Sequence, residues 1–243
     1  MRKNILRINA ALLFIPVLFI CSAGVPAPAA NAPYPAMAPL DQYLMPDEKA
    51  EIALARSSAP PSSSAPPSIS DAADVMVLRR EGYVTAAKGS NGFVCIVQRS
   101  WAKPTDDPEF WNTKVRAPNC FNAAASKTFL PIFLMKTKLV LAGKSKEQIL
   151  AATTSALQKK ELPALAPGAM CYMMAKQQYL SDDGKNWHPH VMFFVSGDAE
   201  KTWGANLPGS PVIAANDPEE RVTIFMVLSG KWSDGSPAVS AAH

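Results

Sequence analysis

The stretch R-V-T-I-F-M-V-L, which runs from Arg221 to Leu228, is apolar at nearly every position and rich in β-branched residues. A strand with one solvated face alternates apolar and polar residues, whereas a strand that is apolar on both faces is buried on both. This stretch therefore predicts a strand that lies centrally in a sheet. The other strands of that sheet must come from elsewhere in the chain.

Strand-like composition recurs in two groups on either side of a helical middle. The segments are Val75–Arg79, Tyr83–Lys88, Phe93–Arg99, Met170–Leu180 and Pro189–Val195. Asn91-Gly92 is a strong hairpin-turn signal, so we expect the first three segments to form a meander.

The middle of the chain has helical character. The segment Cys120–Leu141 is expected to form a helix that is split or kinked at Pro131, and Gly143 ends it. Ser145 and Gln148 have the spacing of a capping box, which predicts a second helix that runs to about Lys160.

This order of elements predicts an α+β domain, in which an antiparallel sheet is built from N-terminal and C-terminal strand groups that flank a helical middle. PAS-like sensor folds have a similar order and enclose a ligand between sheet and helices. The similarity is one of element order, and similarity of fold does not assign a function.

The N-terminus has the features of a secretory signal peptide over residues 1–23. A basic start is followed by an apolar run of twelve residues from Ala10 to Cys21, whereas a membrane-spanning helix needs about 20. Cleavage after Ala23 or after Ala29 fits the small-residue pattern. Cys21 offers an alternative, a lipid-modified N-terminus, which the bulky residues before it disfavour.

The remaining chain divides by composition. Residues 24–70 are rich in Pro, Ala and Ser and are expected to form a tether with one short helix from about Pro46 to Ser57. Residues 71–235 are long enough for one globular domain, and residues 236–243 form a flexible tail.

The charge balance argues against nucleic acid as a partner. The chain has 24 Lys and Arg against 20 Asp and Glu, and signal cleavage removes three of the basic residues, so the mature protein is nearly neutral. The lysines of the helical middle are expected on solvated helix faces. They are Lys136, Lys138, Lys144, Lys146, Lys159 and Lys160.

Two of the three histidines lie one residue apart in N-W-H-P-H-V-M-F-F-V. A hairpin turn at Asp183-Gly184 would oppose His188 to Tyr179 and His190 to Gln177, and these four side chains would share an uncharged face. We expect this face to be the ligand-binding site. The same register would place Cys171 about 20 Å from His190 along the ladder.

A metal site at His188 and His190 is the first alternative. Two histidines at i and i+2 on a strand point the same way, but a catalytic zinc needs at least a third ligand. Asp106, Asp107 and Glu109 are available acids, although nothing in the sequence brings them to the histidines. A hydrogen-bonded structural pair is therefore expected, with no metal and no cofactor.

A thiol enzyme is the second alternative. If Asn119 caps a helix, Cys120 lies in its first turn, where the helix dipole lowers a thiol pKa, and His188 or His190 could act as the base. The competing interpretation is one disulfide among Cys95, Cys120 and Cys171. Cys95 is favoured as a partner, and the pairing stays open.

No standard hydrolase, P-loop or H-E-x-x-H motif is present. The stretches N-G-F-V-C-I-V-Q-R-S-W, G-A-M-C-Y-M-M-A-K-Q and W-H-P-H-V-M-F-F-V resemble those of uncharacterised exported bacterial proteins, which implies a periplasmic or extracellular location and no particular activity. We expect an exported binding or sensing module for a small molecule or an envelope protein. The alternatives are a metal-assisted or Cys/His enzyme and an envelope structural protein.

Overall fold

The computed structural model describes residues 33–56, 64–183 and 188–238. All of them belong to one unit of the chain, Ala32–His243. The signal peptide expected at residues 1–23, both cleavage sites and Cys21 lie outside the described residues.

The described chain forms an eight-stranded sheet in the order β2-β1-β3-β4-β5-β6-β8-β7. The strands are β1 (Asp74–Arg79), β2 (Gly82–Ala87), β3 (Val94–Gln98), β4 (Ala117–Phe121), β5 (Met170–Met173), β6 (His190–Ser196), β7 (Val212–Asp217) and β8 (Val222–Leu228). The helices are α1 (Glu48–Ala55), α2 (Pro67–Ser70), α3 (Ala123–Thr128), α4 (Leu130–Leu141) and α5 (Lys146–Gln158), with 3-10 turns η1 (Leu40–Gln42), η2 (Ser100–Ala102) and η3 (Glu200–Trp203). Because α3, α4 and α5 fall between β4 and β5, the predicted α+β class is confirmed.

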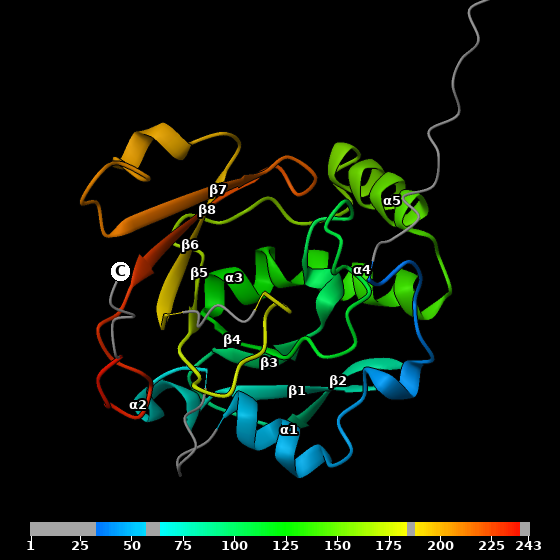
Figure 1. Cartoon of the computed structure of the whole chain (residues 1–243), viewed down its shortest axis with the longest axis horizontal. Helices are drawn as coiled ribbons and strands as arrows, with labels where there is room; N and C mark the ends of the chain where they lie inside the picture. The colour runs from blue at the N-terminus through cyan, green and yellow to red at the C-terminus, as the bar shows by residue number, and fades with distance from the viewer. Residues whose placement is uncertain (1–32, 57–63, 184–187, 239–243) are drawn as a thin grey trace, which may run out of the picture. The chain divides into compact units, whose positions relative to one another are not determined.

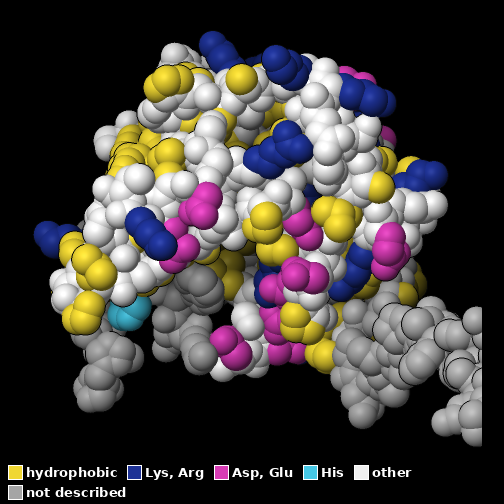
Figure 2. Space-filling view, turned by 90° about the horizontal axis from the view of Figure 1, so that it is seen from above, with side chains coloured by type: hydrophobic (Ala, Val, Ile, Leu, Met, Phe, Trp, Pro, Cys, Tyr) yellow, Lys and Arg dark blue, Asp and Glu magenta, His cyan; other side chains and the backbone are white. Residues whose placement is uncertain are grey.

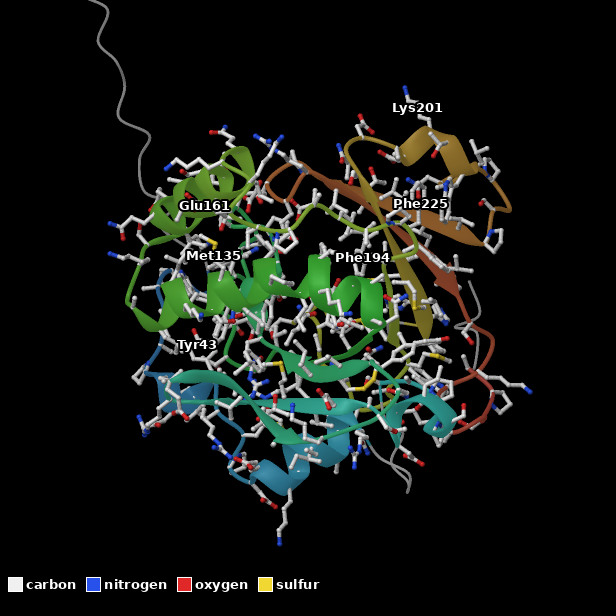
Figure 3. All side chains as sticks on the ribbon, turned by 180° about the vertical axis from the view of Figure 1, so that it is seen from behind. Tyr43, Met135, Glu161, Phe194, Lys201 and Phe225 are labelled. Carbon is white, nitrogen blue, oxygen red and sulfur yellow. A yellow bond between two sulfur atoms is a disulfide. The ribbon has the colours of Figure 1, made fainter. Side chains whose placement is uncertain are left out.

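The sheet is covered on both faces. In Figure 1, α3 and α4 lie above β1 to β4, and α1 lies below them. Farther along the sheet, Phe194 of β6 faces the α3 side and stacks on Phe129, with ring centroids 3.9 Å apart. Phe225 of β8 faces the other way and stacks on Trp203 of η3 at 4.2 Å (Figure 3). Apolar residues are therefore needed on both faces of the central strands, as the composition of β8 indicated.

The expected meander of the first three strands is wrong. β1 lies between the other two, antiparallel to β2 and parallel to β3. The loop after β2 crosses the end of β1: Gly89 passes so close to Ala72 and Ala73 that a Cβ there would lie 2.2 Å from their backbone. The backbone N–H groups of Ser90 and Asn91 both donate to the Ala72 carbonyl oxygen. Asn91-Gly92 therefore belongs to a crossover and not to a hairpin.

The segment that begins at Cys120 was predicted to be helical, and this is wrong for its first residues. They belong to β4, and the helix cap lies three residues beyond Asn119, at Asn122, whose side chain accepts the Ala125 N–H at 2.8 Å. The Asn122 N–H donates to Met170 of β5, so alternate residues of β4, including Pro118, turn their backbone toward β5. β5 has left the sheet opposite Pro118, and the missing N–H of the proline therefore breaks no ladder bond.

The helical middle otherwise follows its local signals. Pro131 stands at the start of α4, so the expected split falls between α3 and α4. Ser145 and Gln148 form the predicted capping box at the start of α5. Both features are set by neighbours in the sequence, which is why the sequence predicts them. No helix in the described part of the chain is long and apolar enough to cross a membrane.

The segment before β1 packs onto the domain, whereas the sequence analysis assigned residues 24–70 to a tether. Tyr43 is fully buried, its ring lies 5.2 Å from that of Trp101, and its hydroxyl donates to the Trp111 carbonyl oxygen at 2.9 Å. One buried aromatic ring outweighs the disorder signal of the surrounding Pro and Ala residues because it buries a large apolar area.

The short helix expected from Pro46 to Ser57 is α1, and it carries a buried acid into the sheet. Glu51 accepts a hydrogen bond from Arg99 at 2.9 Å and another from the backbone N–H of Leu78 at 3.2 Å. Both charged side chains are almost fully buried. This ion pair ties α1 to the residue that follows β3.

Both ends of the C-terminal region are pinned by hydrogen bonds. The side chain of Asn206 bonds to the backbone N–H and C=O of Ala214, both at 3.0 Å, and so covers the outer edge of β7. In the expected tail, the Ala238 N–H donates to the Gly230 carbonyl oxygen at 2.9 Å. Residues 239–243 lie outside the described residues.

Candidate functional site

The predicted pairing of the histidine strand is wrong by four positions. In the structure, His190 opposes Met173 and Met192 opposes Cys171. β5 ends at Met173, because the next residue bonds elsewhere: the Met174 N–H donates to Ser64 and its carbonyl oxygen accepts from Ser233. The connection from β5 to β6 is therefore a long loop and not a tight hairpin, and Gly184 of the expected turn lies outside the described residues.

His190 is buried and electrically neutral. It is 1 % exposed, and its Nδ1 lies 2.8 Å from the carbonyl oxygen of His188. Because a carbonyl can only accept, Nδ1 carries the proton. Burial lowers the pKa of His190 although the bond to His188 opposes this, so the imidazole is neutral at pH 7. Residue 188 contributes its backbone to this arrangement.

The other residues of the predicted face lie elsewhere. Tyr179 forms an isolated bridge with Arg116, and Gln177 lies exposed in the loop after β5. The Tyr179 hydroxyl donates to Asp182, which also accepts hydrogen bonds from Tyr34 and Asn112. The hydrogen bonds from Tyr179 and Tyr34 hold the pKa of Asp182 well below its usual range. This network fastens the loop to the domain.

The acids proposed as further metal ligands are engaged in the same region. Glu109 accepts a hydrogen bond from Lys103 at 2.6 Å and one from the Asp182 backbone at 2.7 Å, and Asp107 lies 3.6 Å from Lys103. Among residues 33–56, 64–183 and 188–238, no group of three or more His, Cys, Asp or Glu side chains is placed to hold a metal ion.

Two of the cysteines form a disulfide. Cys95 and Cys120 are opposed on β3 and β4 and are joined, which leaves Cys171 as a buried thiol. Cys120 lies in a strand, so the dipole argument for its activation does not hold. The Cys171 thiol donates to the Asn119 side chain at 3.5 Å, and burial raises its pKa well above the ordinary value. The predicted distance of about 20 Å between Cys171 and His190 is wrong. Cys171 pairs with Met192 and His190 pairs with Met173, so the two residues are only two positions apart along the ladder.

A cleft of about 620 Å³ lies at the Ser196 end of β6, the end opposite His190. Its walls come from the α3–α4 junction, α5, the segment after α5, and the turn between β7 and β8. The lining residues are Thr128, Phe129, Ile132, Leu157, Lys160, Leu162, Pro163, Ala164, Leu165, Ser196, Gly197, Glu220, Arg221 and Val222. Figure 2 looks onto the side that carries α5 and η3; hydrophobic side chains lie at the bottom of a hollow there, and charged side chains stand around it.

The turn between β7 and β8 places three acids in three directions. The Asp217 side chain accepts the backbone N–H of Glu220 at 3.0 Å, which holds the turn closed. Glu219 accepts the hydroxyl of Thr105 at 2.6 Å. Glu220 reaches inward to Lys136 of α4, with Nζ and Oε1 3.1 Å apart. Arg221 then adopts a positive φ of 56° and leads into β8.

The Lys136–Glu220 pair is buried beside the cleft. Lys136 is 1 % exposed and Glu220 is 9 % exposed, so the expectation that Lys136 lies on a solvated helix face is wrong. Lys136 also donates to the Lys103 carbonyl oxygen at 3.1 Å. Burial raises the pKa of Glu220, and the attraction of Lys136 opposes this. Burial also raises the pKa of Asp217. Two poorly solvated acids, Asp217 and Glu220, therefore share one buried cation, Lys136.

Three charged side chains line the cleft, and each has unused bonding capacity. Oε1 of Glu220 accepts from Lys136, whereas its Oε2 accepts no hydrogen bond within the described chain. The side chains of Lys160 and Arg221 are exposed and make no ion pair or hydrogen bond with any described residue. These groups are available to a bound molecule.

No motif in the sequence indicated this cleft. Lys136 and Glu220 are 84 residues apart, and neither stands in a recognisable motif. The available signal was a lysine among apolar residues in L-P-I-F-L-M-K-T-K-L-V-L, where position 136 shares its face with Ile132, Phe133 and Val140. A lysine on the apolar face of a helix predicts a buried partner.

Comparison with known proteins found no matching family model, no matching curated protein and no matching solved structure.

Proposed function

We propose that this protein is an exported binding module that takes a small, largely apolar molecule into the cleft between α4, α5 and the β7–β8 turn. The observation that carries the proposal is the cleft itself, with apolar walls and a buried acid that keeps one oxygen unbonded. Ligand sites in proteins are usually concave, mostly apolar, and supplied with a few polar groups. The volume of about 620 Å³ lies within the usual range of such sites.

Export is supported by two independent features. The N-terminal sequence has the basic start and short apolar run of a signal peptide. The Cys95–Cys120 disulfide is compatible with an oxidising compartment outside the cytoplasm. The binding proposal replaces the histidine face with the cleft, because His190 is buried and hydrogen-bonded to backbone.

The fluorescent probe 1-anilinonaphthalene-8-sulfonate tests this proposal on the purified exported protein. Its aromatic rings fit the apolar walls, and its sulfonate can pair with Lys160 or Arg221. Ala164 is exposed and lines the cleft, so Ala164→Trp should block saturable binding. Ala142→Trp, at an exposed position that does not line the cleft, should leave binding unchanged. Equal binding by both variants, with unchanged unfolding temperatures, would refute the site.

A further inference from the structure

The charges of the cleft restrict the chemistry of its ligand. Eleven of its lining residues are uncharged, and the three charged ones are an acid and two bases. Glu220 lies at the β7–β8 turn beside Arg221, and Lys160, two residues beyond α5, lines the same cleft. An acceptor and two cationic donors therefore open onto one apolar space.

The unbonded oxygen of Glu220 can accept a hydrogen bond from a ligand. Glu220 is more than nine-tenths buried, and only its Oε1 is paired, with Lys136. Oε2 is not one of the fully buried, unpaired side-chain atoms of the described chain, so it is open to the cleft and can accept from a bound molecule. A charged hydrogen bond to it is stronger than a neutral one. A ligand ammonium would supply both the donor and an opposite charge.

The two basic side chains of the cleft, Lys160 and Arg221, can bind an anionic group of a ligand. Lys160 and Arg221 have no partner within the described chain. Both stand at positions with positive φ, 58° and 56° respectively, where the backbone turns sharply at the end of an element. An arginine fork and a lysine together recognise a carboxylate or phosphate. A simple fatty acid would pair with these bases but make no use of the Glu220 oxygen.

We propose that the cleft binds a zwitterion with an apolar side chain, namely an apolar amino acid or a short apolar peptide. The ammonium binds Oε2 of Glu220, the carboxylate binds Lys160 and Arg221, and the side chains pack on Phe129, Ile132, Leu157 and Val222. This inference rests on the proposed binding function and specifies the ligand class for it.

Titration calorimetry with four matched ligands tests the inference on the purified exported protein. The ligands are leucyl-leucine, its N-acetyl form, its C-terminal amide, and the form with both ends blocked; free leucine is compared in parallel to distinguish an amino acid from a peptide. Each single block should weaken binding about tenfold, because it removes one charged hydrogen-bonded contact.

Variants assign each end of the ligand to its residue. Glu220→Gln should remove the advantage of the free ammonium and leave the advantage of the free carboxylate. Lys160→Met combined with Arg221→Met should do the reverse. Glu161→Gln and Lys159→Met change exposed neighbours that do not line the cleft and should change neither. Glu161, labelled in Figure 3, lies in the segment that follows α5.

The outcomes separate the two proposals. If all four ligands bind equally and Ala164→Trp blocks them, the cleft binds ligand but the zwitterion assignment is wrong. If none binds while the fluorescent probe still binds in an Ala164-dependent manner, the zwitterion assignment fails and the binding function stands. If neither the dipeptides nor the probe binds, both proposals fail.

Discussion

The two ends of β6 use buried titratable groups in opposite ways. At one end, His190 is neutral, and its Nδ1–H is bonded to the backbone carbonyl of the residue two positions earlier. At the other end, about 20 Å along the strand, Ser196 lies at a cleft where Glu220 keeps one oxygen unbonded and two basic side chains have no described partner.

This difference separates a structural group from a candidate binding group. A buried polar group is normally satisfied by its own protein. Burial alone therefore says little about function, whereas burial combined with unused bonding capacity and an adjacent cleft points to a ligand. The histidine end was the more conspicuous in sequence, and the acidic turn is the better candidate in structure.

Removal of Lys136 should have the largest effect. In Lys136→Met, Glu220 and Asp217 remain buried without their cation, and the free energy of unfolding should fall by about 4 kcal/mol. Urea denaturation followed by circular dichroism measures this loss. Lys138→Met, at an exposed position on the same helix, should change stability little.

The double variant Lys136→Met/Glu220→Met should recover much of the stability, because it removes both buried charges together. If Lys136→Met is as stable as the wild type, the Lys136–Glu220 pair contributes nothing to the free energy of unfolding.

Removal of the disulfide should lower the stability of the whole domain, including both ends of β6. Cys95 and Cys120 are 25 residues apart and lie in the central strands. Replacing both with Ala frees that loop in the unfolded chain and should cost about 3 kcal/mol. Treating the wild type with reductant should give the same denaturation curve as the variant. A much larger loss for the variant alone would indicate damaged packing.

Removal of His190 should lower stability but not binding. His190→Ala leaves a small cavity and an unpaired His188 carbonyl oxygen, at a cost of about 2 kcal/mol. His188→Ala should cost much less, since the carbonyl it contributes belongs to the backbone. Fluorescent probe binding measured well below the unfolding temperature should be unchanged in both. Weakened binding in His190→Ala would indicate that the histidine end of β6 takes part in ligand binding.

Local signals in the sequence predict part of the fold. Pro131, the Ser145–Gln148 capping box and the apolar β8 each act through neighbouring residues, and each is where the pattern indicates. Asn119 and Asn122 show the limit of such signals. Asparagine is a good helix cap at either position, and only the tertiary pairing of β4 with β3 and β5 selects the second.

The candidate site could not be predicted in the same way. Lys136 and Glu220 meet only because α4 packs beside the β7–β8 turn, and no local pattern records that contact. The histidine register failed for a related reason. It assumed a tight turn, whereas Met174 bonds to Ser64 and Ser233 from distant parts of the chain. Non-local hydrogen bonds decided both places.

Asp217→Asn should give the smallest of the four stability changes, and its sign depends on pH. Burial raises the pKa of Asp217, so its contribution to stability is fully present below the unfolded pKa of about 3.9 and is lost as pH rises through the folded pKa. Asparagine does not titrate and still accepts the Glu220 N–H. The variant should therefore be more stable than the wild type at pH 7, and the advantage should shrink toward pH 3.

Denaturation curves at pH 3, 5 and 7 measure this difference. Asp217→Ala serves as the control, because it also removes the acceptor of the Glu220 N–H and should be less stable than Asp217→Asn at every pH. If Asp217→Asn is instead less stable than the wild type at pH 7, attraction to Lys136 outweighs the burial of the charge. The acids of the turn would then hold the cleft together, and the excess of buried negative charge would be a source of stability at this end of β6.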